Sequence, residues 1–228
     1  MVDSKAFGPT VNELWKSSLR TSIAGFASIN YRLSPHPNHP KLPSSPEDPS
    51  RNVQYPSHLL DVEKALLYLQ DQYQISNRYL LMGHSAGATM AFELQRGSLP
   101  IPVAVLGIAG IYDFEGLIKA HDHPAYLEFM ENAFPDKTLW KKAAPFTNFS
   151  PDNLYEITKS VIISYSDDDQ LVETGQATSM LERIALGPLP QGRVHVLKAS
   201  GNHDDIWRSG TILASVITKS LEIVRNSI

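Results

Sequence analysis

The sequence lacks cysteine altogether. A disulfide framework, a thiol nucleophile and a cysteine-bound metal are therefore excluded. The sequence also lacks an apolar run of about 18 residues, the length needed to cross a bilayer, and its first ten residues contain no apolar signal-peptide core. These absences predict a chain that works in the cytoplasm and does not enter a membrane.

The sequence has no excess of basic charge either. It carries 20 Lys and Arg against 24 Asp and Glu, a formal net charge of −4. Nucleic acids and anionic membranes are therefore poor candidate partners, and a small molecule is a better one. No dense metal-ligand spacing such as HExxH occurs, so we expect neither a metal nor an organic cofactor. With 42% hydrophobic residues over 228 positions, the chain suits one globular domain spanning residues 1–228.

Predicted strands alternate with predicted helices along the chain. This order is typical of a mostly parallel sheet with helices on both faces. Six prolines make residues 34–55 an extended loop, and residues 113–155 are expected to form a small helical cap of two or three short helices. The sequence predicts strands over residues 21–31, 78–82, 101–108, 160–165 and 193–198, and helices over residues 10–19, 57–69, 88–94, 173–185 and 205–225.

The most informative motif is Gly83-His84-Ser85-Ala86-Gly87, which lies between an apolar run and a helix-forming run. A serine on a sharp turn from strand to helix is held exposed beside a base, as in a nucleophile elbow. We expect a side chain at Gly83 or Gly87 to collide with the neighbouring strand or helix. Ser85 as a helix N-cap is the simpler alternative. If Ser85 is the nucleophile, the N–H of Ala86 is one oxyanion donor.

An acid and then a histidine should follow such a serine in the chain. Asp169 follows the predicted strand 160–165, and His203 lies in the loop after the last predicted strand. We expect these two residues to be the acid and the base. Asp167 and Asp113 remain alternatives for the acid. The histidines outside the motif and this loop are expected to be surface or structural residues; they are His36, His39, His58, His121, His123 and His195.

Five short stretches carry a resemblance that covers nearly the whole chain. They are Asn30 to Pro35 (NYRLSP), the GHSAG motif, Gly110 to Asp113 (GIYD), Ser164 to Asp167 (SYSD) and Gly201 to Asp205 (GNHDD). Together they resemble the fungal kynurenine formamidases, which are arylformamidases of the α/β-hydrolase superfamily.

The resemblance implies an α/β-hydrolase fold and the hydrolysis of N-formyl-L-kynurenine to L-kynurenine and formate. This step belongs to tryptophan degradation and feeds NAD synthesis. The resemblance also implies that Ser85, Asp169 and His203 form the triad, without a metal or a cofactor. Whether the chain forms a homodimer stays open.

One motif of that family is absent from the sequence. The family carries His-Gly-Gly-x-Trp upstream of the first helix, where its N–H groups form half of the oxyanion hole, and no such sequence occurs here. We therefore expect this chain to lack the N-terminal strands of the fold, to leave a gap in the sheet between residues 21–31 and 78–82, and to have reduced activity or none.

Two alternative functions remain. The stretch Tyr31 to Pro35 and the elbow are shared with esterases of the hormone-sensitive-lipase type, so a carboxylesterase with a different acyl pocket fits the same residues. A catalytically inactive α/β-hydrolase-like protein that only binds a ligand fits the absent oxyanion motif. A preference for formyl over butyryl substrates would separate the first alternative from the formamidase.

Overall fold

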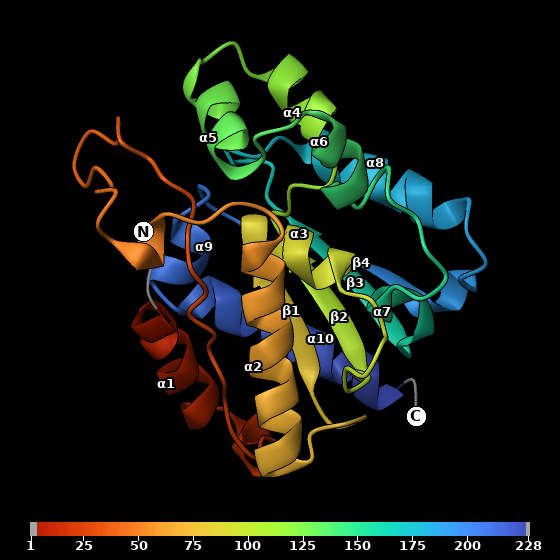
Figure 1. The fold of residues 1–228 in the computed structure, drawn as a ribbon. Helices are drawn as coiled ribbons and strands as arrows, with labels where there is room; N and C mark the ends of the chain where they lie inside the picture. Colours follow the sequence, from red (N-terminus) through yellow and green to blue (C-terminus); the bar gives the residue numbers. More distant parts are fainter. Residues whose placement is uncertain (1–3, 227–228) are drawn as a thin grey trace.

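A four-stranded parallel sheet forms the centre of the computed structural model, which describes residues 4–226 (Figure 1). The strands lie side by side in the order in which they occur in the chain. In the first three strands, Leu80 is paired with Ala104, and Ala104 is paired with Ser160. All four strands therefore end at the same edge of the sheet. The strands are β1 (Leu80–His84), β2 (Ala104–Ile108), β3 (Ser160–Tyr165) and β4 (Val194–Lys198).

Two apolar cores lie on opposite faces of this sheet, because successive strand residues point to opposite sides. Val105 and Val161 pack with α2, α3, α7 and α8, whereas Leu106 and Ile162 pack with α1, α9 and α10. Figure 1 shows α2 and α3 in front of the sheet and α10 behind it. The helices on these faces are α1 (Gly8–Lys16), α2 (Ser57–Tyr73), α3 (Ala86–Glu93), α7 (Leu154–Ile157), α8 (Thr174–Ala185), α9 (Asp205–Arg208) and α10 (Thr211–Asn226).

Three further helices lie above the carboxyl ends of the strands (Figure 1). They share a small core of their own, in which Leu117, Met130 and Trp140 are buried. The segment of residues 113–155 was expected to hold two or three short helices, and this expectation is confirmed. The helices are α4 (Phe114–Ala120), α5 (Ala125–Ala133) and α6 (Thr138–Ala143).

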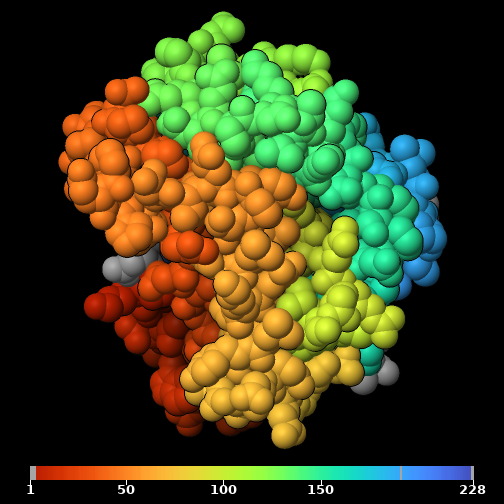
Figure 2. Space-filling view, viewed as in Figure 1, coloured from red at the N-terminus to blue at the C-terminus, as the bar shows by residue number. Residues whose placement is uncertain are grey.

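The proline-rich loop of residues 34–55 lies beside these helices, and both form one continuous surface in Figure 2. The Tyr55 N–H donates to the carbonyl oxygen of Ala133 at 2.9 Å, and the rings of Tyr55 and Phe134 lie 5.2 Å apart. The loop thereby fastens the cap helices to the start of α2.

The predicted strand over residues 21–31 is wrong. Ser18–Ser22 is a short 3-10 helix, and residues 23–35 run extended without joining the sheet in the described part of the chain. An extended segment becomes a strand only through a ladder, and β1, the edge of the described sheet, pairs with β2 alone. Two apolar side chains at its end still pack inward, since Ile29 and Tyr31 contact the core on the α2 side of the sheet, whereas Phe26 stays exposed.

The predicted helix over residues 205–225 is divided into α9 and α10. Gly210 separates them with a φ of +82°, a left-handed conformation that ends a helix. A Cβ on Gly210 would lie 2.4 Å from the carbonyl carbon of Pro9, so the same glycine lets α1 approach closely. The break depends on a contact between distant segments.

A buried carboxyl group closes the last turn of α3. Glu93 is 6% exposed, and its Oε1 has no hydrogen-bond partner among the described residues. Burial raises the pKa of Glu93 to about 8; the charge of Glu63 adds to this rise and the Tyr55 hydroxyl opposes it. Folded protein therefore holds a proton on Glu93 at neutral pH, where an unfolded glutamate has lost it.

Replacing this group should change the pH dependence of stability. Between about pH 4.5 and pH 8 the folded state binds the proton more tightly, so the free energy of unfolding should fall by up to about 1.4 kcal/mol per pH unit. Glu93→Gln does not titrate, so its free energy of unfolding should rise relative to that of the wild type as the pH rises, and this gain should level off above about pH 8. Urea melts across this range measure the effect. Exposed Glu222 supplies the control Glu222→Gln, which should keep the wild-type slope; an unchanged slope in Glu93→Gln would contradict the assignment.

Candidate active site

Ser85 lies at the turn between β1 and α3 in a conformation that side chains rarely adopt, with φ 55° and ψ −124°. Its N–H donates to the carbonyl oxygen of Ile108 at 3.0 Å, which fixes the turn against β2. Its side chain makes no capping hydrogen bond to α3, so the N-cap alternative is not supported. Strain of this kind is typical of functional residues.

The two glycines of the motif have different roles. A Cβ on Gly83 would lie 2.1 Å from the carbonyl oxygen of Gly87, whereas a Cβ on Gly87 would meet nothing within 4 Å. The expected collision is therefore correct for Gly83 and wrong for Gly87. Position 83 requires a glycine because the backbone of Gly87 lies against it. Position 87 has room for a side chain.

This difference predicts opposite effects of two matched substitutions. Gly83→Ala should lower the free energy of unfolding by about 1–3 kcal/mol or more, because the backbone of the turn must move. Gly87→Ala should be neutral or slightly stabilising, because alanine favours a helix over glycine by about 0.5–1 kcal/mol. Thermal melts of the two variants test this order; equal melting temperatures would show that the turn is not held by this contact.

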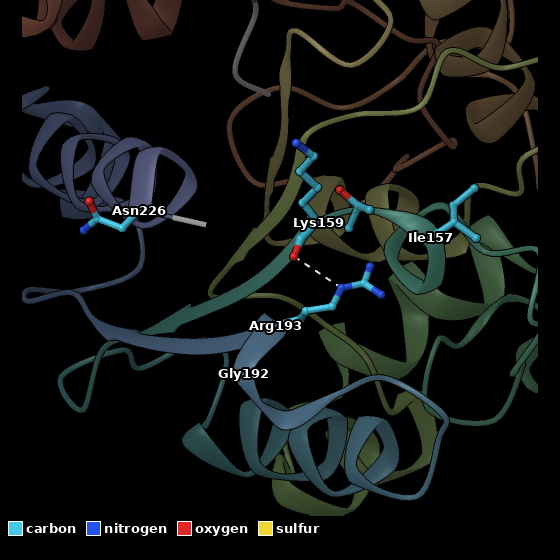
Figure 3. Close-up of a pocket in the computed structure, with 6 residues that line it drawn as sticks. Ile157, Lys159, Gly192, Arg193 and Asn226 are labelled. Carbon is cyan, nitrogen blue, oxygen red and sulfur yellow. Dashed lines mark hydrogen bonds between the residues drawn. The ribbon is translucent and has the colours of Figure 1, made fainter. Parts of the chain in front are cut away.

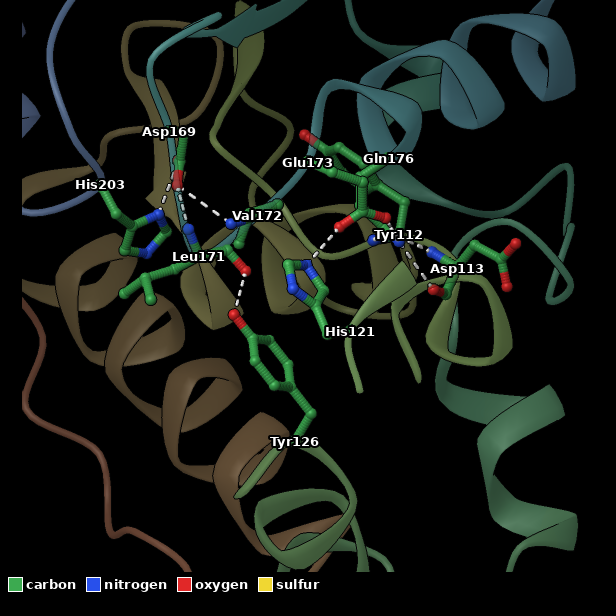
Figure 4. Close-up of polar contacts among 10 residues, drawn as sticks. All are labelled: Tyr112, Asp113, His121, Tyr126, Asp169, Leu171, Val172, Glu173, Gln176 and His203. Atoms are coloured by element: carbon green, nitrogen blue, oxygen red, sulfur yellow. Dashed lines mark hydrogen bonds and ion pairs between the residues drawn. The ribbon is translucent and has the colours of Figure 1, made fainter. Parts of the chain in front are cut away.

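Asp169 and His203 form a buried pair (Figure 4). Asp169 Oδ2 lies 2.7 Å from His203 Nδ1, and the two side chains are 1% and 9% exposed. Burial alone would raise the pKa of Asp169, but hydrogen bonds from His203 and from the N–H groups of Val172 and Leu171 outweigh it and lower the pKa below its ordinary value. Asp169 is therefore ionised, and Nε2 is the His203 nitrogen left for other contacts.

The other candidate acids lie elsewhere. Asp167 is exposed and pairs with Lys198 at 2.6 Å. Asp113 caps α4 by accepting from the Gly116 N–H at 3.0 Å. Among the three candidate acids, Asp169 is the one that contacts His203 in the structure.

Hydrogen bonds join the loop that carries Asp169 (residues 166–173, the acid loop) to the loop that carries His203 (residues 199–204, the histidine loop). Ser166 is buried, and its hydroxyl donates to the carbonyl oxygen of Gly201 at 2.7 Å. The Gly201 N–H in turn donates to Asp168 Oδ2 at 3.3 Å. The sequence analysis did not single out Ser166, although a small polar residue directly after a buried strand is a signal for such a contact.

A second set of contacts joins the cap segment to the acid loop (Figure 4). His121 Nε2 lies 2.9 Å from Glu173 Oε2, and its ring stacks on Tyr126 at 4.1 Å. The Tyr126 hydroxyl donates to the carbonyl oxygen of Leu171 at 2.9 Å. Buried Gln176 accepts from the N–H groups of Tyr112 and Asp113 at 2.8 Å each. The segment that follows β2 is thereby held by the turn that carries Asp169 and by the first turn of α8, which follows it.

The opposite end of the sheet has a shallow pocket around Lys159 and Arg193, at the amino ends of β3 and β4 (Figure 3). Arg193 Nε donates to the Lys159 carbonyl oxygen at 3.2 Å. Ligands of parallel sheets bind at the carboxyl ends of the strands, where Ser85, Asp169 and His203 lie, so we assign no role to this pocket. Residues 4–226 contain no group of three or more His, Asp or Glu placed to hold a metal ion, and no helix in this range has the length and apolarity needed to cross a membrane.

Comparisons with known proteins identify the family. No protein-family model matches the chain. The kynurenine formamidase-like hydrolase fscH of Fusarium equiseti is 35% identical over 95% of this chain and 76% of that protein. Kynurenine formamidase avaC of Aspergillus versicolor is 32% identical over 91% of this chain and 78% of that protein. The structure of carboxyl esterase 2 from Tuber melanosporum, at 14% identity, shares the fold with a TM-score of 0.65 over 99% of this chain and 73% of that one. The resemblance found in the sequence is confirmed, and the chain belongs to the kynurenine formamidase family of α/β hydrolases.

Proposed function

We propose that this chain hydrolyses the formamide of N-formyl-L-kynurenine to L-kynurenine and formate, with Ser85 as nucleophile, His203 as base and Asp169 as the acid that orients it. The observation that carries the proposal is the buried Asp169–His203 hydrogen bond of 2.7 Å at the sheet edge where strained Ser85 lies. The relative from Aspergillus versicolor, named a kynurenine formamidase, supports the substrate.

The reaction follows from the chemistry of these groups. His203 Nε2 takes the proton of the Ser85 hydroxyl as Oγ attacks the formyl carbon, and the ionised Asp169 stabilises the imidazolium. Collapse of the tetrahedral intermediate breaks the C–N bond, and His203 gives its proton to the leaving aryl amine. Water then attacks the formyl ester with His203 again as base, which releases formate and restores Ser85.

Oxyanion stabilisation is assigned to the start of α3. The Ala86 N–H belongs to the first turn of this helix, where N–H groups have no intrahelical acceptor. It therefore supports the developing negative charge, together with the positive end of the helix dipole. The sequence contains no His-Gly-Gly-x-Trp motif to provide the other half of the hole, so Ala86 is the one donor that we assign.

A fluorophosphonate probe tests the triad, because it reports nucleophile reactivity even where turnover is slow. We expect label on Ser85 and none in Ser85→Ala. Asp169→Asn should slow labelling by up to roughly 10⁴-fold, because the imidazole loses its orienting anion. Asp167→Asn is the matched control, since it removes a neighbouring carboxylate that binds only exposed Lys198, and it should label at the wild-type rate. Strong slowing in Asp167→Asn with none in Asp169→Asn would transfer the acid role to Asp167.

Substrate preference and the oxyanion hole are tested together by turnover. The chain should cleave N-formyl-L-kynurenine in preference to a butyryl ester, because a formyl group needs almost no acyl pocket. Adding an upstream segment that ends in His-Gly-Gly-x-Trp should raise turnover by at least ~100-fold, because it supplies oxyanion donors. Faster hydrolysis of the butyryl ester in both forms would indicate a carboxylesterase, and labelling of Ser85 without any turnover in either form would indicate a binding protein.

A further inference from the structure

His84 contacts the proposed base although the reaction as described does not use it. It ends β1, directly before Ser85, and its ring lies against the ring of His203 with centroids 4.4 Å apart and planes tilted by 46°. His203 belongs to the loop after β4, at the far side of the sheet order from β1. The contact therefore joins the strand that carries the nucleophile to the loop that carries the base.

The ring of His84 is uncharged. Burial lowers the pKa of His84 to about 4, and the neighbouring His203 lowers it too, while the charges of Asp169 and Asp204 and a hydrogen bond to the His203 backbone oppose these effects. A charged neighbour would repel the imidazolium that forms on His203 during the reaction. An uncharged ring contacts that imidazolium without this repulsion.

The contact supplies a restraint that Asp169 alone does not. The Asp169 hydrogen bond fixes His203 at Nδ1, but the imidazole ring is still free to tilt about that bond. The ring of His84, whose plane is tilted by 46° from that of His203, adds a second contact that restricts this tilt. The Nε2 atom of His84 is buried and has no hydrogen-bond partner among residues 4–226, and a hydrogen bond to the backbone of His203 accompanies the ring contact.

We propose that His84 is a positioning residue, whose uncharged ring packs against the imidazole of His203 and holds Nε2 of His203 toward Ser85. The inference rests on the roles proposed above for Ser85 and His203. It assigns the second residue of the GHSAG motif a role in orienting the base, in addition to its place in the strand.

Three variants test this role. His84→Ala removes the ring and should slow fluorophosphonate labelling of Ser85 and lower kcat by roughly 10- to 100-fold, the range expected for a misplaced catalytic group, with KM little changed. His84→Phe keeps an aromatic face and should recover the rate to within roughly 3-fold of the wild type. His195→Phe is the matched control, because His195 on β4 also has a buried Nε2 without a partner among the described residues, and this change should leave the labelling rate unaltered.

A second readout is independent of activity. The proton of the Asp169–His203 hydrogen bond should exchange with water faster in His84→Ala than in the wild type and in His84→Phe, as followed by proton NMR. Thermal melts of all variants identify any that are not folded. If His84→Ala is not folded, the labelling rate and the proton exchange of folded His84→Phe decide. A purely structural role would lower the melting temperature without changing proton exchange or kcat in the folded protein.

The results separate this inference from the proposed function. Wild-type labelling and proton exchange in folded His84→Ala would overturn the positioning role. Equal impairment of folded His84→Ala and His84→Phe would also overturn it, because a nitrogen and not the ring would then matter. Unchanged labelling in His203→Ala would instead show that the triad assignment has failed, whatever the His84 variants do.

Discussion

The parallel ladder extends one residue beyond the strands, and the candidate site depends on these last hydrogen bonds. The Ser85 N–H donates to Ile108, the Ala109 N–H donates to Ser164, and the Ala199 N–H donates to Tyr165, at 2.8–3.0 Å. Each loop of the site therefore leaves the sheet from a position fixed by the neighbouring strand. Buried backbone groups must be paired. These backbone hydrogen bonds therefore position the loops independently of the side-chain contacts of the site.

Burial raises the pKa of one carboxyl group, while the pKa of another is lowered in spite of it. Asp169 has three hydrogen bonds to its charged form, and they outweigh burial and keep it ionised. Glu93 has an unpartnered Oε1 and only the Tyr55 hydroxyl to oppose burial, so it holds a proton. His84, which contacts His203, stays neutral because burial disfavours its cation. Burial and the number of hydrogen bonds to the charged form together decide which group is ionised.

Features that depend on local sequence were predictable. The Pro56-Ser57 start of α2, strand β3 and the GHSAG turn follow from nearby residues, and each lies where the sequence indicated. Features that depend on distant partners were not. Residues 21–31 have the alternation of a strand but no ladder, and the break at Gly210 reflects the approach of Pro9. The hydrogen bond that distinguishes Asp169 from Asp167 and Asp113 depends on the position of His203, which a sequence pattern does not give. The chain's resemblance to a known family, carried by short motifs around the site, predicted the fold more reliably than strand patterns did.

The backbone of Leu171 links Asp169 to the cap segment. Its N–H donates to Asp169 Oδ1, and its carbonyl oxygen accepts from the Tyr126 hydroxyl, both at 2.9 Å. Tyr126 stacks on His121, which pairs with Glu173 two residues further along the same turn. The acid turn is therefore held from one side by His203 and from the other by residues of the cap segment. In such an arrangement, a change in the cap segment that moves Tyr126 also moves a hydrogen-bond donor of Asp169, so the cap segment and the proposed orientation of His203 are not independent.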